Sequence, residues 1–216
     1  KREVEFLNFC FSSPKKPVVA IVGGSKVSSK LGVLENLANR VDSLIVGGGI
    51  ANTFLVAANK DVGKSLYEKQ LVDRARAIMD KVEVILPSDV VVSTEISDKS
   101  VALKKLVDDI GPDEMVLDIG ISSSERVSKI LEASGTIIWN GPVGVFEIEQ
   151  FSEGTKSVSA AVSESGAFSI AGGGDTLAAI EKYKISENIS YISTGGGAFL
   201  KFLENGRLPA IDILNQ

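Results

Sequence analysis

Short runs of β-branched and other apolar residues alternate with segments of helical periodicity along almost the whole chain. The runs predict strands at 18–22, 43–46, 83–86, 115–119, 136–139, 168–171 and 190–193. Apolar residues that recur every three or four positions predict helices at 27–40, 50–59, 67–80, 122–133, 155–164, 176–183 and 198–204. Residues 89–104 interrupt this rhythm, and we expect a short extra pair of strands there.

The pattern also indicates how the strands are covered and connected. Continuous Val/Ile runs are typical of strands that are buried on both faces. Repeated strand-helix units with short connections indicate crossovers and parallel pairing. We therefore expect residues 15–216 to form one α/β domain, a doubly wound, mostly parallel sheet with helices on both faces, as in Rossmann-like folds. Residues 1–14 have helical spacing and then meet a proline, which predicts a connector helix to a missing N-terminal domain.

Four predicted strands run directly into glycine-rich turns at 23–24, 47–49, 172–174 and 195–197. A glycine lets backbone N–H groups approach an anion closely, and the N-terminus of a following helix adds positive partial charge. Ligands of parallel sheets bind beyond the carboxyl ends of the strands. Four such turns on one rim therefore predict a surface that holds a polyphosphate.

Neither of the two common phosphate-binding motifs fits these turns. Asn52, Leu177 and Leu200 stand where the dinucleotide fingerprint Gly-x-Gly-x-x-Gly needs its third glycine. Residues 63–65 have the Gly-Lys-Ser ending of a Walker-type loop, but Ala58 occupies the place of its first glycine. We interpret that short match as accidental.

Lys26 and Lys30 follow the first glycine turn. At a spacing of four they are predicted to share one face of a helix. A solvated lysine face is one interpretation. Two cations in the first turns of a helix oppose its macrodipole, however, so we favour the alternative in which they neutralise a bound anion.

Two further stretches carry polar groups at the same predicted rim. Asp175 and Thr176 stand at a helix start, where Asp175 either caps the helix or approaches a magnesium-nucleotide while Thr176 contacts phosphate. The turn that begins at Asn140 is either a tight strand exit or a binding site. As a site it offers an amide, an apolar wall at Pro142 and Val143, and the Glu147 carboxylate, which suits a ribose diol.

Composition restricts the partners. The net charge of −5 disfavours nonspecific binding to nucleic acid or anionic membranes. No run approaches the roughly 18 apolar residues of a membrane span. The single cysteine, Cys10, cannot form an internal disulfide, which fits a reducing compartment. Because the chain has no histidine, proton transfer would need carboxylates, lysine or tyrosine.

Seven motifs that occur in order carry a family resemblance. They are Gly-Gly-Ser-Lys-Val-Ser-Ser-Lys at 23–30, Gly-Gly-Gly-Ile-Ala-Asn-Thr-Phe at 47–54, Leu-Pro-Ser-Asp at 86–89, Leu-Asp-Ile-Gly at 117–120, Trp-Asn-Gly-Pro-Val-Gly-Val-Phe-Glu at 139–147, Gly-Gly-Gly-Asp-Thr at 172–176 and Ser-Thr-Gly-Gly-Gly-Ala at 193–198. Together they resemble the nucleotide-binding, C-terminal half of phosphoglycerate kinase over nearly the whole chain. The string at 139–147 is the most specific of them.

The resemblance implies a cytoplasmic, monomeric glycolytic kinase. Such an enzyme moves a phosphoryl group reversibly between 1,3-bisphosphoglycerate and ADP, and it uses Mg²⁺ with ADP or ATP. It implies that Lys26 neutralises charge on the transferring group and that Lys30 contacts nucleotide phosphate. It also implies that Gly195 and Gly196 offer N–H groups to the phosphoryl group in flight.

The resemblance further implies a set of nucleotide contacts. They fall on Gly24, Lys30, Gly47, Gly48, Leu66, Leu117, Asn140, Val143, Glu147, Gly173, Gly174, Asp175 and Thr176. Within this set the adenine slot is walled by Gly47, Gly48, Leu66, Leu117 and Val143. Glu147 would reach the ribose, and Asp175 would hold the metal.

Two departures from the family pattern matter. Val116 and Ile121 stand where the family commonly carries glycine and proline, and Val116 would narrow the adenine slot or shift the base. The half that binds 3-phosphoglycerate is absent, and the six arginines of this chain form no cluster that could replace it. We therefore expect nucleotide binding without turnover, because aligning two substrates requires both halves to close.

Two other classes of function stay open at this point. A non-catalytic module on the same fold could bind another anion or a protein, and the residues at 116 and 121 support it. A dinucleotide oxidoreductase is consistent with the fold alone. The three failed fingerprints argue against that second class.

Overall fold

The computed structural model describes residues 13–205, so the connector helix expected before Pro14 lies outside the described residues. A six-stranded sheet forms the centre, in the order β3-β2-β1-β7-β8-β9, and every neighbouring pair is parallel. Its strands are β1 (Val18–Val22), β2 (Ser43–Val46), β3 (Glu83–Ile85), β7 (Thr136–Asn140), β8 (Phe168–Gly172) and β9 (Tyr191–Ser193). The chain adds strands outward from β1 and then, from β7, outward on the other side, which confirms the doubly wound sheet.

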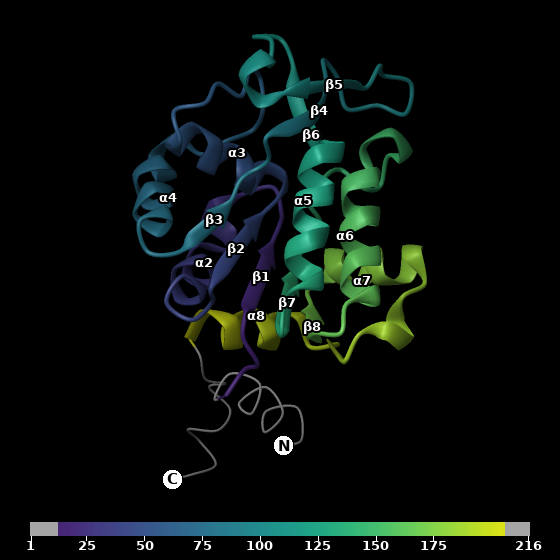
Figure 1. Cartoon of the computed structure of the whole chain (residues 1–216). Coiled ribbons are helices and arrows are strands. Elements are labelled where there is room, and N and C mark those ends of the chain that lie inside the picture. Colours follow the sequence, from purple (N-terminus) through teal and green to yellow (C-terminus); the bar gives the residue numbers. More distant parts are fainter. Residues whose placement is uncertain (1–12, 206–216) are drawn as a thin grey trace.

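Helices cover both faces of this sheet (Figure 1). They are α2 (Leu31–Leu37), α3 (Gly48–Ala57), α4 (Val72–Met79), α5 (Ile121–Glu132), α6 (Glu153–Glu164), α7 (Gly174–Tyr183) and α8 (Gly196–Asn205). In β1, Val18, Ala20 and Val22 pack with α2, α3, α4 and α8, whereas Val19 and Ile21 pack with α5, α6 and α7. Because successive strand residues point to opposite faces, one apolar strand contributes to two cores. No helix within residues 13–205 has the length and apolar character to cross a membrane.

A second, antiparallel sheet interrupts the alternation. It has the order β5-β4-β6 and contains β4 (Asp89–Ser93), β5 (Leu103–Leu106) and β6 (Met115–Ile119). The extra strand pair expected within 89–104 is present, although the second strand lies slightly later. The strand at 115–119 pairs with β4 here and takes no part in the parallel sheet. Only residues 86–88 separate β3 from β4, which is too short for a parallel crossover, so the chain leaves the main sheet.

Asp118 joins the small sheet to the helical layer. Its side chain is buried and accepts hydrogen bonds from the Ile119 N–H at 2.9 Å and from the Gly154 N–H in α6 at 2.7 Å. A Cβ on Gly144 would lie 2.1 Å from the Asp118 carboxylate, so this loop packs directly on the acid. Burial raises the pKa of the Asp118 carboxyl to about 7.

We therefore predict that Asp118 makes the stability of this domain depend on pH. Its pKa is higher in the folded protein than in the unfolded chain, so its stabilising contribution is full below the usual pKa of an aspartate and is lost as the pH rises through about 7. Urea unfolding between about pH 5 and 8 measures this, with Asp118→Asn as the reference that does not titrate. A constant difference in unfolding free energy between the two proteins across that range would contradict the prediction.

Candidate functional site

Three turns at the carboxyl edge of the sheet pack backbone against backbone. The Gly23 N–H donates to the Asn140 carbonyl at 3.0 Å, the Ile50 N–H to Gly24 at 3.1 Å and the Gly48 N–H to Val143 at 3.0 Å. A Cβ on Gly23 would lie only 1.7 Å from the Pro142 carbonyl oxygen. The first two glycine turns are therefore hydrogen-bonded to each other and to the 140–143 turn. Several of their N–H groups already donate to neighbouring carbonyls and are not free for a ligand.

The start of α7 differs, because its first helical residue, Gly174, has no packing neighbour in the described chain, although the Asn140 side chain packs against the preceding Gly173. A Cβ on Gly174 would meet no atom within 4 Å, and the N-cap residue Gly173, at φ 103°, has no side-chain capping bond. The first N–H groups of a helix have no partner within the helix. The start of α8 lies beside this one, since a Cβ on Gly196 would be 4.0 Å from the Gly173 Cα. Two adjacent helix N-termini thus form the part of the rim that is open to an anion.

The spacing of four predicted that Lys26 and Lys30 share one helix face, and this prediction is wrong. A 3-10 turn at Val27–Ser29 separates them, and α2 begins at Leu31. The Lys30 Nζ instead reaches under the rim and donates to the carbonyls of Gly23, at 2.6 Å, and Asn140, at 3.1 Å. Burial lowers the pKa of Lys30 to about 8, although the charge of Asp175 opposes this shift. Lys30 is therefore a desolvated cation that an incoming anion would stabilise.

Lys26 is exposed, and its charge acts on a carboxylate of this chain, that of Glu68. The Glu68 carboxylate accepts the Ser28 N–H at 2.7 Å. Hydrogen bonds from Ser28, with a further contribution from the charge of Lys26, lower the pKa of Glu68. The cations that follow the first turn are thus partly balanced without a ligand.

Asn140 and Thr176 act below the surface of the rim. The Thr176 hydroxyl accepts the Gly141 N–H at 2.7 Å and donates to the Gly172 carbonyl at 2.9 Å, and the Asn140 Nδ2 donates to the same carbonyl at 2.6 Å. Both side chains are buried, and these bonds hold the 141 and 172 turns together. Within the described residues the Asn140 Oδ1 is buried and has no hydrogen-bond partner. Because the Thr176 hydroxyl is already paired, the backbone N–H is the group of this residue that could contact a phosphate. Asp175 does not cap α7, since the N-cap is Gly173.

A cavity of about 390 Å³ opens beside these turns. Among the residues expected to contact nucleotide, its lining includes Gly24, Gly48, Leu66, Leu117, Glu147 and Asp175. The lining also includes Pro142, expected as an apolar wall, and Val116. The sequence did not single out the other lining residues as contacts: Ser25, Gly49, Asn52, Ile96, Met115, Gly144 and Val145. Glycines and a carboxylate thus form one part of the cavity, and residues of the small sheet and its loops form an apolar part.

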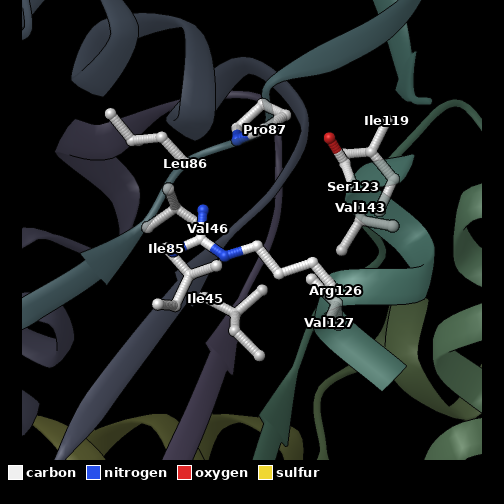
Figure 2. A pocket seen from close by; sticks show the side chains of 10 residues that line it. All are labelled: Ile45, Val46, Ile85, Leu86, Pro87, Ile119, Ser123, Arg126, Val127 and Val143. Atoms are coloured by element: carbon white, nitrogen blue, oxygen red, sulfur yellow. The ribbon is translucent and has the colours of Figure 1, made fainter. Parts of the chain in front are cut away.

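Val143 and Gly47, expected in the adenine slot, lie outside this lining. The two residues pack on each other, because a Cβ on Gly47 would lie 2.4 Å from the Val143 Cα. Figure 2 shows Val143 near Ile119 and Arg126 in a separate apolar cleft of about 10 Å³. That cleft has room for about one water molecule at most. Val145, two residues further along, lines the larger cavity.

The metal expectation depends on a single carboxylate. Asp175 is exposed in the first turn of α7 and lines the cavity. Within residues 13–205 no group of three or more His, Cys, Asp or Glu side chains is placed to hold a metal ion. Magnesium often binds through one or two carboxylates together with substrate phosphates. The residues present therefore suit a metal that arrives with a nucleotide, and they do not form a protein-only metal cage.

The contrast between the two kinds of glycine yields a prediction about stability. Gly23→Ala should lower the free energy of unfolding by about 1–3 kcal/mol or more, because the new methyl group meets backbone that cannot move away. Gly174→Ala should leave stability unchanged or slightly higher, because its Cβ enters open space and alanine favours a helix. Urea unfolding measures both, with Gly166→Ala, also in open space, as the control. Equal stability of the Gly23 and Gly174 variants would refute the packing argument.

Comparison with known proteins agrees with this geometry. The family model for phosphoglycerate kinase matches residues 1–206. The phosphoglycerate kinase structure from Coxiella burnetii is 50% identical with a TM-score of 0.95, and 99% of this chain matches 56% of that one. The enzyme from Pyrococcus horikoshii OT3 is 34% identical with a TM-score of 0.86, and 99% of this chain matches 55% of that one. This chain spans about half the length of these relatives, and it belongs to the phosphoglycerate kinase family.

Proposed function

We propose that this chain is the nucleotide-binding part of a phosphoglycerate kinase and binds magnesium-ADP or magnesium-ATP. The observation that carries the proposal is the cavity itself, whose lining combines an apolar part with rim glycines and Asp175 in the first turn of α7. The partly buried Lys30 lies against the same rim, because its Nζ donates to the Gly23 carbonyl. Its volume of about 390 Å³ is in the usual range of small-ligand pockets, so Val116 narrows the slot without closing it.

The rim would act on the phosphates. Phosphoryl transfer passes through a loose transition state, so it needs alignment and neutralised charge more than a covalent nucleophile. Lys30 and the first N–H groups of α7 would hold the nucleotide phosphates. The exposed Lys26 and the Gly195 and Gly196 turn would meet the transferring group. Magnesium, held by Asp175 and nucleotide phosphates, would neutralise part of the charge.

The apolar part would hold the base and the sugar. Gly48 begins α3, Leu66 lies in the connection between α3 and α4, and Leu117 lies in β6 of the small sheet. All three line the cavity. The exposed carboxylate of Glu147 also lines it and could accept hydrogen bonds from ribose hydroxyls. Val145 takes the place in the wall that the sequence assigned to Val143.

The remaining functional assignments are also proposals. Residues 1–14 would connect this domain, residues 15–216, to the half that binds 3-phosphoglycerate. We propose that the whole enzyme is a cytoplasmic monomer without a nucleic-acid or membrane partner. Because this chain spans about half of its relatives, catalysis would depend on that other half.

We predict that magnesium-ADP binding depends on the charge of Lys30. In the protein without ligand, Lys30 has a pKa of about 8, and a bound phosphate would raise this pKa. Above that pH the lysine must therefore take up a proton when the nucleotide binds. Affinity should therefore fall as the pH rises from about 8, by up to about tenfold per pH unit. Calorimetry in buffers of different ionisation enthalpy measures both the affinity and the proton uptake.

Lys30→Met should bind more weakly and lose the pH dependence. Lys156→Met is the matched control, because Lys156 is an exposed lysine paired with Glu153 at 3.0 Å and should leave binding unchanged. Equal affinities of wild type and Lys30→Met would remove Lys30 from the site. An absence of magnesium-ADP binding to the folded wild-type chain would refute the proposed function.

We also predict negligible phosphoryl transfer to 3-phosphoglycerate by this chain alone. Its physical cause is the absence of a second surface that orients the acceptor and closes over the reaction. A coupled assay with magnesium-ATP and 3-phosphoglycerate tests this, with an intact phosphoglycerate kinase as the positive control. Turnover near that of the intact enzyme would contradict the prediction.

A further inference from the structure

Asn52 is a polar residue in the wall of the cavity that the function proposed above does not use. It lies in α3, four residues after Gly48 and three after Gly49, so the three residues share one face of the helix. All three line the cavity. The rest of the buried α3 face is almost entirely apolar, which makes this amide unusual at its position.

The amide of Asn52 is only half satisfied. The side chain is 2% exposed, and its Nδ2 donates to the Leu66 carbonyl at 3.1 Å. Since that carbonyl can only accept, the nitrogen must face Leu66 and the oxygen must face elsewhere. Within the described residues Oδ1 is buried and has no hydrogen-bond partner. A buried acceptor without a donor is unfavourable, so its position in a ligand cavity indicates that a ligand supplies the donor.

The surroundings restrict what that ligand group is. Leu66, Val116 and Leu117 line the same cavity, so the part near Asn52 suits a flat apolar ring and not a phosphate. The Ser65 hydroxyl donates its hydrogen to the Val62 carbonyl and accepts the Val116 N–H at 2.8 Å, so it offers no donor to Asn52. An N–H group on the edge of an aromatic ring would supply the missing donor and fit these apolar surroundings.

We propose that Asn52 reads the edge of the purine base, with Oδ1 accepting a hydrogen bond from an exocyclic 6-amino group. This inference rests on the nucleotide function proposed above. A 6-oxopurine would bring a carbonyl oxygen toward Oδ1. To pair with it the amide would have to turn, and its oxygen would then face the Leu66 carbonyl. Asn52 therefore favours adenine over hypoxanthine.

Calorimetry on this chain tests the proposal with magnesium-ADP and magnesium-IDP, which differ in the 6-substituent. The wild type should bind ADP roughly tenfold more tightly than IDP, the size of one well-placed hydrogen bond. In Asn52→Leu the ratio should fall to about twofold or less. Asn36→Leu is the matched control, because Asn36 also donates from Nδ2 to a backbone carbonyl, that of Leu203, but lies on α2. It should keep the wild-type ratio.

A second comparison avoids dependence on a variant that could fail to fold. Wild-type chain should bind magnesium-ADP more tightly than the diphosphate of purine riboside, which carries hydrogen in place of the amino group. Equal affinity of the wild type for these ligands, or an unchanged ADP-to-IDP ratio in folded Asn52→Leu, would overturn the role of Asn52 and leave the nucleotide function standing. If neither ADP nor magnesium tripolyphosphate binds, the nucleotide function is wrong and this proposal fails with it.

Discussion

The site depends on one constraint: three backbone turns must touch each other with no side chain between them. The turns after β1, β2 and β7 exchange hydrogen bonds between Gly23 and Asn140, between Ile50 and Gly24, and between Gly48 and Val143. A methyl group on Gly23 would overlap the neighbouring carbonyl. Because packed backbone cannot relax as a flexible side chain can, this contact fixes the turns after β1, β2 and β7 relative to one another.

Lys30 turns that constraint into an electrostatic feature. Its Nζ lies between the Gly23 and Asn140 carbonyls, so the turns that pack together also remove the cation from water. Desolvation disfavours its charge and leaves it receptive to an anion. The side chains of Thr176 and Asn140 hold the turns at Gly141 and Gly172 together through hydrogen bonds inside the protein. The first N–H groups of α7 take no part in these bonds. The bonds that stabilise the rim thus use different atoms from those that we propose for binding.

The small antiparallel sheet supplies what a parallel sheet alone would lack. β6 places Leu117 and Val116 against the α3 side of the cavity, and buried Asp118 ties that strand to the start of α6. The same acid packs against Gly144, next to Val145 in the cavity wall. An apolar wall and the glycine rim are therefore joined through a buried carboxyl whose pKa is raised to about 7 by burial.

Periodicity predicted the parallel sheet and the helices on both of its faces, and the glycine motifs at strand ends predicted the rim of turns. These features follow from local patterns and from how parallel strands connect. The resemblance of ordered motifs predicted the family. Sequence could not decide which sheet β6 joins, because that depends on the short link after β3. Nor could it show that the Thr176 hydroxyl is occupied, that Val143 faces away from the cavity, or that Asn52 has an unpaired oxygen.

Those outcomes depend on contacts between residues far apart in the chain. Sequence determined which residues this protein has for building an anion site. Only the tertiary structure decided which of their atoms are still free to bind, because a polar group that one distant residue has already paired is no longer open to a ligand.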